Sequence, residues 1–370
     1  MDARLLAAPA WVKGLAYAIT FAVIIGTSLP HVPRMYLDYS SLPLLAGIDQ
    51  PPTYGPDSLS DMYAAKVILN DWRDMYTRRH LEQTPLEAAT WTKEEVAPYP
   101  PAVLLAEAGL YAIGEWTGLG FYGMILGLAV VFISWSAWYF LQTRWYLFPL
   151  LYLNFGYLSE RFVYVQDDSY LVMLVVVIGA LAAMRSRRET LSHLLMAVAT
   201  VMKLSPLYYV RHLTAMRPVA RWMYLGILAA GLVLPWLIWD NYLYIFRFHE
   251  GAKGNVYDTI AAVLVSVPIA LLLYRVEARG GFDREDWIGW SLVPFAVFLG
   301  VKMRVTRHLL LVLLVPDKRG SRNIIAALGL ALHALLPHLV LWGSVLYIST
   351  ALLIAVLVWH VRAVRRTPRH

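Results

Sequence analysis

Apolar runs recur along the whole sequence, and most of them end at a lysine or an arginine. The clearest run, Leu119–Leu141, holds no charged residue and is long enough to cross a bilayer as a helix. Of the 370 residues, 59% are hydrophobic and only 15% are charged, which is too apolar for a soluble domain of this size. We therefore predict an all-α polytopic membrane protein with about eleven transmembrane helices.

The basic residues at the ends of the runs predict how the chain is oriented. Cytoplasmic loops carry an excess of lysine and arginine, so Arg4 and Lys13 place the N-terminus in the cytoplasm, and Arg185–Arg188 mark another cytoplasmic loop. Two polar segments, 31–101 and 240–258, then face the other side of the membrane. The cytoplasmic loops explain the net charge of +7, so we expect no nucleic-acid partner.

Two segments do not fit the pattern of a simple span. Ala102–Trp116 is short and contains Glu107, so we expect a helix that is partly embedded at the outer surface. Leu191–Val210 has basic residues at both ends and contains Lys203 and a proline, which predicts a helical hairpin broken near Lys203. In the alternative topology, residues 102–116 span the membrane fully, and the arginine cluster before the hairpin then faces outward. The positive-inside rule disfavours that alternative.

Carboxylates in the polar segments are candidates for catalysis. Asp57 and Asp61 lie in YGPDSLSDMYAAK, four residues apart, so a helix would place both on one face. Either could be a general base that takes the proton from an attacking hydroxyl, or both could be ordinary solvated acids. Asp167 and Asp168 stand at the outer mouth of a span, where they could orient a hydroxyl, bind a hard cation such as Mg²⁺, or be solvated. Arg161 could restrain this second pair.

Cationic side chains on the outer side would suit an anionic ligand. Lys203 lies within an apolar run, where it could bind an anionic headgroup or snorkel to the interface. Arg247 and His249, with Tyr257 and two glycines, suit a loop that closes on a phosphate or a sugar, or form an ordinary polar loop. A further cluster of basic residues lies on the outer side, against the positive-inside trend, and needs an anion to explain it. We expect that anion to be a lipid phosphate, unless this part of the topology is inverted. That cluster consists of Lys302, Arg304, Arg307 and His308.

Cofactor sites have little support in the sequence. The chain has no cysteine, which excludes a thiolate metal site, and its histidines lack metal-ligand spacing. No glycine-rich nucleotide loop follows a strand, so a nucleotide-sugar donor is not expected. A divalent cation at the acidic pair stays an alternative.

Six elements follow one another along the chain: DSLSDMYAAK, DMY at Asp74–Tyr76, YPP at Tyr99–Pro101, RFVYVQDDSYLVML, MKLSPLYY and RFHEGAKGNVYD. These motifs and their order resemble those of the GT-C membrane glycosyltransferases, most closely the polyprenyl-phosphate-mannose-dependent alpha-mannosyltransferases. The resemblance covers most of residues 15–310 and implies the GT-C fold, with residues 1–370 forming one domain around a long first extracytoplasmic loop. A prokaryotic plasma membrane fits the short loops, with the endoplasmic reticulum membrane as the eukaryotic equivalent.

The resemblance implies an inverting transfer of a hexose, with mannose expected, from a polyprenyl-phosphate donor to a lipid-linked or glycan acceptor on the extracytoplasmic side. Such enzymes generally need no metal or other cofactor. Asp57 fits the position of the catalytic base better than Asp61. The other implied roles are donor-phosphate binding by Lys203, Arg247, His249, Arg304, Arg307 and His308, and positioning by Asp167, Asp168, Arg161, Tyr99 and Tyr257.

Two other classes of function are open. A lipid or glycolipid flippase would also use charge within the membrane, but transport does not need a large acidic loop, and the chain has no strict internal repeat. A non-catalytic assembly subunit would have dispensable acids. The acceptor, the linkage and the oligomeric state are not determined by the sequence.

Overall fold

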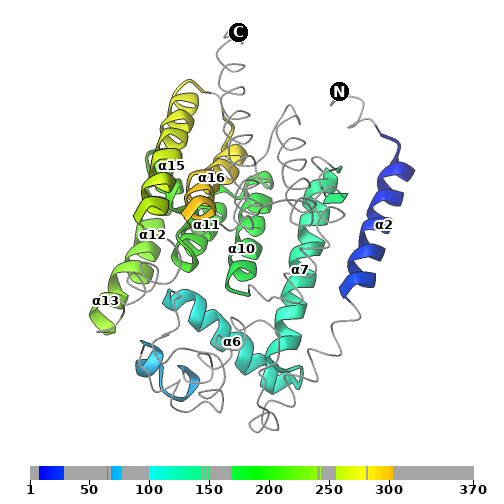
Figure 1. Cartoon of the computed structure of the whole chain (residues 1–370), viewed down its shortest axis with the longest axis horizontal. Coiled ribbons are helices and arrows are strands. Elements are labelled where there is room, and N and C mark those ends of the chain that lie inside the picture. Colours follow the sequence, from blue (N-terminus) through cyan, green and yellow to red (C-terminus); the bar gives the residue numbers. More distant parts are fainter. Residues whose placement is uncertain are drawn as a thin grey trace.

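The elements of the computed structural model are all helices in the part of the chain that it describes (Figure 1). In those same residues, three helices are long and apolar enough to cross a membrane: Gly123–Gln142, Pro218–Ile238 and Thr259–Glu277. The described residues are thus all helical and include helices suited to a membrane, as predicted, whereas the count of about eleven remains a prediction. The described residues are 8–28, 65, 68–76, 100–142, 145–146, 148–149, 168–239, 242, 256–280 and 282–302.

One of these spans is built from three helical pieces in succession. α12 (Pro218–Leu228) opens with a proline, where the missing N–H loses no hydrogen bond. It continues through a π-helical turn, η6 (Ala229–Val233), into α13 (Leu234–Ile238). Trp222 is 71% exposed and Leu237 80% exposed. Such a row of bare apolar side chains is stable where the helix faces lipid rather than water.

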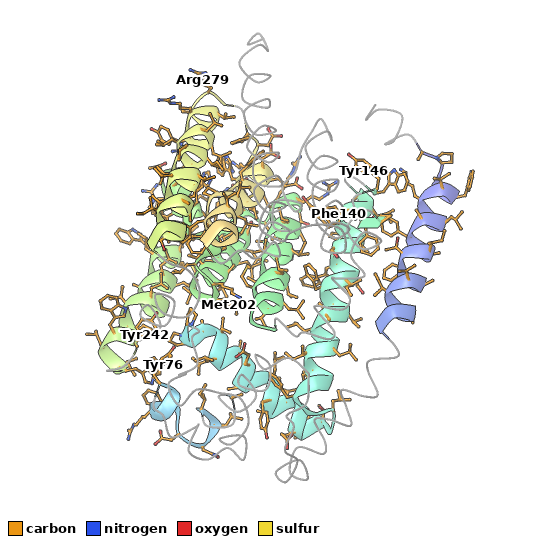
Figure 2. The ribbon with its side chains drawn as sticks, viewed as in Figure 1. Tyr76, Phe140, Tyr146, Met202, Tyr242 and Arg279 are labelled. Carbon is orange, nitrogen blue, oxygen red and sulfur yellow. The ribbon has the colours of Figure 1, made fainter. Side chains whose placement is uncertain are left out.

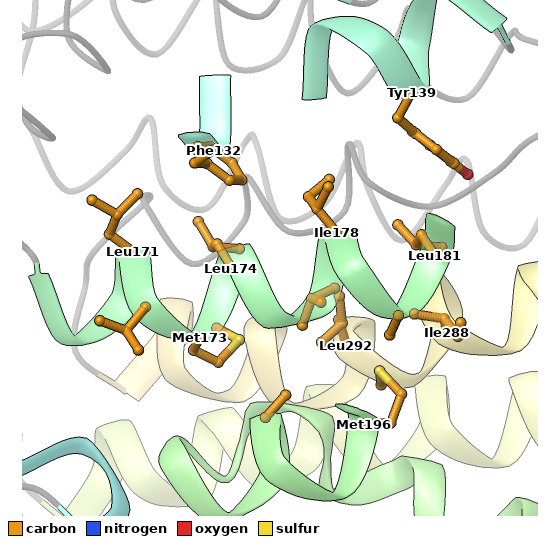
Figure 3. Packing of buried hydrophobic residues seen from close by; sticks show 14 of the residues in the cluster. Phe132, Tyr139, Leu171, Met173, Leu174, Ile178, Leu181, Met196, Ile288 and Leu292 are labelled. Carbon is orange, nitrogen blue, oxygen red and sulfur yellow. The ribbon is translucent and has the colours of Figure 1, made fainter. Parts of the chain in front are cut away.

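α10 (Asp168–Arg185) lies at the centre of the packing. Apolar residues cover it on all sides, as expected of a fully enclosed helix, and Val177 and Ile178 are completely buried. The helices that enclose α10 are α7 (Gly120–Gln142), α11 (Glu189–Met202) and α16 (Arg284–Lys302). Figure 3 shows Phe132 of α7 above one side of α10, and Leu292 of α16 on the opposite side. At the edge, α2 (Ala10–Ser28) packs through Tyr17, whose ring stacks on that of Phe148 at 4.7 Å.

Several helices begin or end together at one end of the molecule, which we call the basic end. Arg185 Nη1 lies 3.7 Å from Glu285 Oε1, and Arg284 pairs with Glu189, so α10, α11 and α16 are joined there. Tyr139 Oη donates a hydrogen bond to Glu285 Oε1 at 2.6 Å and adds α7. Arg279, just after α15 (Val256–Glu277), marks this end in Figure 2. The arginines of the basic end are Arg185, Arg187, Arg188, Arg211, Arg217, Arg221, Arg275, Arg279 and Arg284.

α11 and η5 (Ser205–Ala215) form a hairpin that starts and finishes at the basic end. α11 runs away from that end, Lys203 takes an extended conformation (φ −149°, ψ 121°), and η5 returns as a 3₁₀ helix. His193 Nδ1 lies 2.9 Å from Tyr209 Oη and joins the two arms. The break falls at Lys203, where the sequence predicted it, because Pro206 has no N–H with which to continue α11.

α6 (Pro101–Thr117) lies obliquely across the opposite end, where it packs against α10 and α11 (Figure 1). Gly118 ends the helix in a left-handed conformation (φ 72°), a common stop signal because glycine has no side chain to clash there. Glu107 of this helix is completely buried. The short helix predicted over residues 102–116 is therefore present, with its acidic residue turned into the protein.

Candidate functional site

Most of the predicted site residues lie outside the described part of the chain. Lys203 is described with its side chain. For Asp168 and Tyr257 the backbone is described, and these two residues lie in the first turns of α10 and α15. The residues outside the described part are Asp57, Asp61, Tyr99, Arg161, Asp167, Arg247, His249, Arg304, Arg307 and His308.

Four aromatic residues, which we call the aromatic cluster, join the two predicted outer segments: Trp72, Tyr76, Trp239 and Tyr242. The first two belong to η2 (Trp72–Tyr76) in segment 31–101, whereas Trp239 follows α13 and Tyr242 lies in segment 240–258. Trp239 Nε1 donates a hydrogen bond to the carbonyl oxygen of Trp72 at 3.1 Å. The ring of Tyr76 lies 5.8 Å from that of Trp239 and 5.7 Å from that of Tyr242, in the tilted and edge-on arrangements that aromatic pairs favour.

The aromatic cluster rests on α6 at the end of the molecule opposite the basic end. Leu104 and Ala108 of α6 pack against it, together with Ala65 and Ile68 of the first polar segment. Ala65 is completely buried and follows Asp61 by four residues in the sequence. Ala65, four residues after the second predicted catalytic acid, is therefore fixed at this end, which we call the aromatic end.

Burial determines the protonation of the two tyrosines of the aromatic cluster. Desolvation raises the pKa of Tyr76 far above its usual value, and the neighbouring Tyr242 raises it further. Desolvation also raises the pKa of Tyr242. Both phenols are consequently neutral at physiological pH, so they serve as packing and hydrogen-bonding groups rather than as bases.

Lys203 stands at the tip of the hairpin, on the side facing the aromatic end. Its backbone N–H bonds to the Ala199 carbonyl oxygen at 3.0 Å, which closes the last turn of α11, and its side chain is half-buried. Figure 2 shows the adjacent Met202 next to α6, consistent with the packing of α6 against α11. A cation at the end of an apolar helix, away from the basic end, is an arrangement suited to holding an anion.

A second polar network lies at the basic end, and the sequence analysis did not predict it. His212 Nδ1 lies 2.9 Å from Glu277 Oε1, and the Arg211 guanidinium pairs with Oε2 of the same carboxylate. The His212 ring stacks on Trp287 with 4.4 Å between centroids and 8° between planes. Glu277 is 66 residues from Arg211, so no local spacing could have indicated this pairing.

Comparisons with known proteins give no assignment. A scan against protein-family models finds no match, and searches of curated proteins and of solved structures find none either. Among the described residues, no group of three or more histidine, aspartate or glutamate side chains is placed to hold a metal ion. Function is therefore inferred from the geometry together with the sequence motifs.

Proposed function

We propose that the protein is a membrane glycosyltransferase that moves a hexose, with mannose expected, from a polyprenyl-phosphate donor to a lipid-linked or glycan acceptor. The aromatic cluster is the observation that carries this proposal. It joins the segment that contains Asp57 and Asp61 to the segment that contains Arg247 and His249. Transfer from a lipid phosphate needs a base and phosphate-binding cations around one substrate, and the joined segments carry both kinds of group.

The distribution of charge supports the orientation that this reaction requires. The arginines of the basic end would face the cytoplasm, as the positive-inside rule predicts, and the aromatic end would face the other side. Lys203 would then approach the donor phosphate from within the membrane. A long prenyl tail reaches such a site from the bilayer, which explains why so much of the chain is apolar.

The proposed step is an inverting displacement. Asp57, or Asp61 in its place, takes the proton of the acceptor hydroxyl while the hydroxyl oxygen attacks the anomeric carbon from the face opposite the phosphate. The bond from that carbon to the phosphate oxygen breaks, and its electron pair leaves with the lipid phosphate. Nearby cations neutralise the departing charge and lower the barrier. None of these steps calls for a metal or an organic cofactor.

The remaining assignments follow the resemblance to GT-C enzymes. We propose the GT-C fold with about eleven transmembrane helices, of which the described residues supply a part. The donor phosphate would contact Lys203, Arg247, His249, Arg304, Arg307 and His308, and the substrates would be positioned by Asp167, Asp168, Arg161, Tyr99 and Tyr257.

Transfer of labelled hexose in membranes tests the proposal. Membranes containing wild type, Asp57→Asn, Asp61→Asn or Asp71→Asn receive polyprenyl-phosphate-[³H]mannose and a lipid extract that supplies acceptors. Loss of the base is expected to lower transfer at least about 100-fold. Asp71 is the matched control, since it is an exposed acid of the same segment whose Oδ1 accepts a hydrogen bond from the backbone N–H of Arg73.

Each outcome decides a different part of the proposal. Equal transfer by wild type and Asp57→Asn removes Asp57 as the base, and loss in Asp61→Asn alone assigns that role to Asp61. If wild-type membranes leave the donor unconsumed with every extract, the glycosyltransferase proposal is wrong. Movement of labelled lipid across proteoliposomes without hexose transfer would support the flippase instead.

A further inference from the structure

The return arm of the hairpin is an unusually long 3₁₀ helix. η5 holds this geometry over 11 residues, although 3₁₀ runs longer than about four residues are uncommon because their hydrogen bonds are poorly aligned. Contacts along its length compensate. Tyr208 Oη donates to the Ala270 carbonyl oxygen of α15 at 3.0 Å, and Arg221 Nε donates to the Leu213 carbonyl oxygen at 2.8 Å. The arm is therefore held by its neighbours in addition to its own backbone hydrogen bonds.

Glu277 provides the most concentrated of these contacts. Its Oε1 accepts from His212 and its Oε2 from Arg211, so one carboxylate of α15 holds two successive residues of η5. The side chains of His212 and Glu277 are only 4% and 15% exposed, which shields this pairing from the screening that weakens surface ion pairs. Trp287 stacks on the face of the His212 ring, and the Arg211 guanidinium lies 3.8 Å from the centre of the Tyr274 ring.

A fixed point at Arg211 sets the position of the hairpin tip. Arg211 is six positions after Ser205, the first residue of η5, and at a 3₁₀ rise of about 2 Å per residue this places the start of the arm about 12 Å from the anchor. The second arm is tied to the first by His193 and Tyr209. With both arms held, the depth of Lys203 in the protein follows from where Glu277 holds η5.

We propose that Glu277 is a positioning residue for Lys203. Its contacts with Arg211 and His212 fix η5, and η5 in turn sets how deep in the protein Lys203 lies when it binds an anionic lipid phosphate. The phosphate ligand rests on the proposed function, whereas the mechanical link between Glu277 and the tip does not. A carboxylate that only stabilised the fold would leave the local environment of residue 203 unchanged in the folded variant.

The absence of cysteine makes this link directly measurable. Lys203→Cys introduces a unique thiol into the chain, and its rate of reaction with a membrane-impermeant maleimide reports how accessible the tip is. In proteoliposomes we expect Glu277→Gln to change this rate about threefold or more, because a loosened arm opens locally more often. Glu285→Gln is the matched control, since Glu285 lies at the same end and its carboxylate pairs with Arg185 of α10 and Tyr139 of α7. Equal rates in all three proteins would overturn the proposal.

A milder variant covers the case in which Glu277→Gln fails to fold. Arg211→Lys keeps the charge but loses the planar guanidinium that engages the carboxylate, so we expect the same direction of change with a smaller size. Folding of every variant is checked by size-exclusion chromatography in detergent. A folded Arg211→Lys protein with an unchanged labelling rate would contradict the proposal as well.

Transfer kinetics of proteins that retain Lys203 test whether this lysine binds the donor phosphate. Glu277→Gln should raise the donor KM about tenfold while kcat changes less than about twofold, and Glu277→Asp should recover part of the loss. Glu285→Gln should change neither constant. A response in thiol labelling with no transfer activity in any protein would retain the mechanical link and reject the enzyme, whereas normal KM with altered labelling would reject Lys203 as the phosphate ligand.

Discussion

Gly231 lies so close to Val201 that no other residue fits at position 231 without movement. A methyl group on its Cα would lie 2.7 Å from Cγ2 and 2.8 Å from Cβ of Val201, and closer still to Cγ1. Gly231 is in the π-helical turn η6, and its carbonyl loses its usual helical donor because Pro235, four residues later, has no N–H. The turn therefore brings the apolar helix formed by α12, η6 and α13 against α11, two residues before Lys203.

Gly231→Ala is expected to lower the free energy of unfolding by about 2 kcal/mol, because the added methyl meets a stiff β-branched side chain. Thermal unfolding in detergent, followed by intrinsic fluorescence, measures the loss. Val201→Ala in the same chain should restore much of it. Gly226→Ala is the control, since nothing lies within 4 Å of its added methyl, and it should be neutral or slightly stabilising. Equal effects of the two glycine substitutions would contradict the packing described for η6.

Trp239→Phe should destabilise the contact between the two polar segments. The substitution removes the N–H that donates to Trp72 and leaves that carbonyl without this donor, at an expected cost of about 1 kcal/mol. Limited proteolysis within segment 31–101 should accelerate, alongside a lower melting temperature. Trp236→Phe serves as comparison, because Trp236 is 54% exposed and its ring lies 6.5 Å from that of Tyr242, whereas the hydrogen bond to Trp72 comes from Trp239. A larger effect at position 236 would show that the hydrogen bond does not hold the segments together.

Single cysteines test the proposed orientation. Asp71 and Arg279 are both exposed and lie at the aromatic and basic ends. In intact cells, a membrane-impermeant maleimide should label Asp71→Cys, and it should label Arg279→Cys only after permeabilisation, as the positive-inside rule requires. The parent chain has no thiol, so it gives the background directly. Labelling in the reverse order would invert the topology and place the proposed site in the cytoplasm.

The buried phenol of Tyr76 predicts a specific alkaline sensitivity. Because desolvation raises its pKa in the folded protein, the stability it contributes is complete below the unfolded value of about 10 and is lost as pH rises above that value. The phenylalanine in Tyr76→Phe cannot ionise. Between pH 10 and pH 11 the melting temperature of this variant should therefore fall less than that of wild type, with a difference on the order of a few degrees. Parallel curves for the two proteins would mean that Tyr76 is not buried in its neutral form.

Short sequence patterns predicted those structural elements that depend only on residues close to one another in the sequence. The helix over 102–116 was indicated by an apolar run after paired prolines, and the break at Lys203 by basic ends around a proline. The sequence did not predict that the return arm is a 3₁₀ helix, or that a π turn precedes Pro235, because both depend on close packing by neighbouring helices. Of the candidate site, the place of Lys203 at a helix break was predicted from the sequence, whereas its role remains a prediction. The roles of Asp57, Asp61 and the cluster that begins at Lys302 remain predictions as well.

By itself, the sequence determined the class of the protein and the segregation of its charges. Hydrocarbon offers no hydrogen-bond partner for a backbone amide, so apolar runs of this length must form helices. The arginines between these runs must lie at the ends of the helices, where water can solvate them. Only the tertiary structure decided which distant residues meet. Trp239 and Trp72 are 167 residues apart, and Glu277 and Arg211 are 66 apart. Their pairing depends on how complete helices pack side by side. The local pattern of an apolar helix surface does not specify which other helix packs against it.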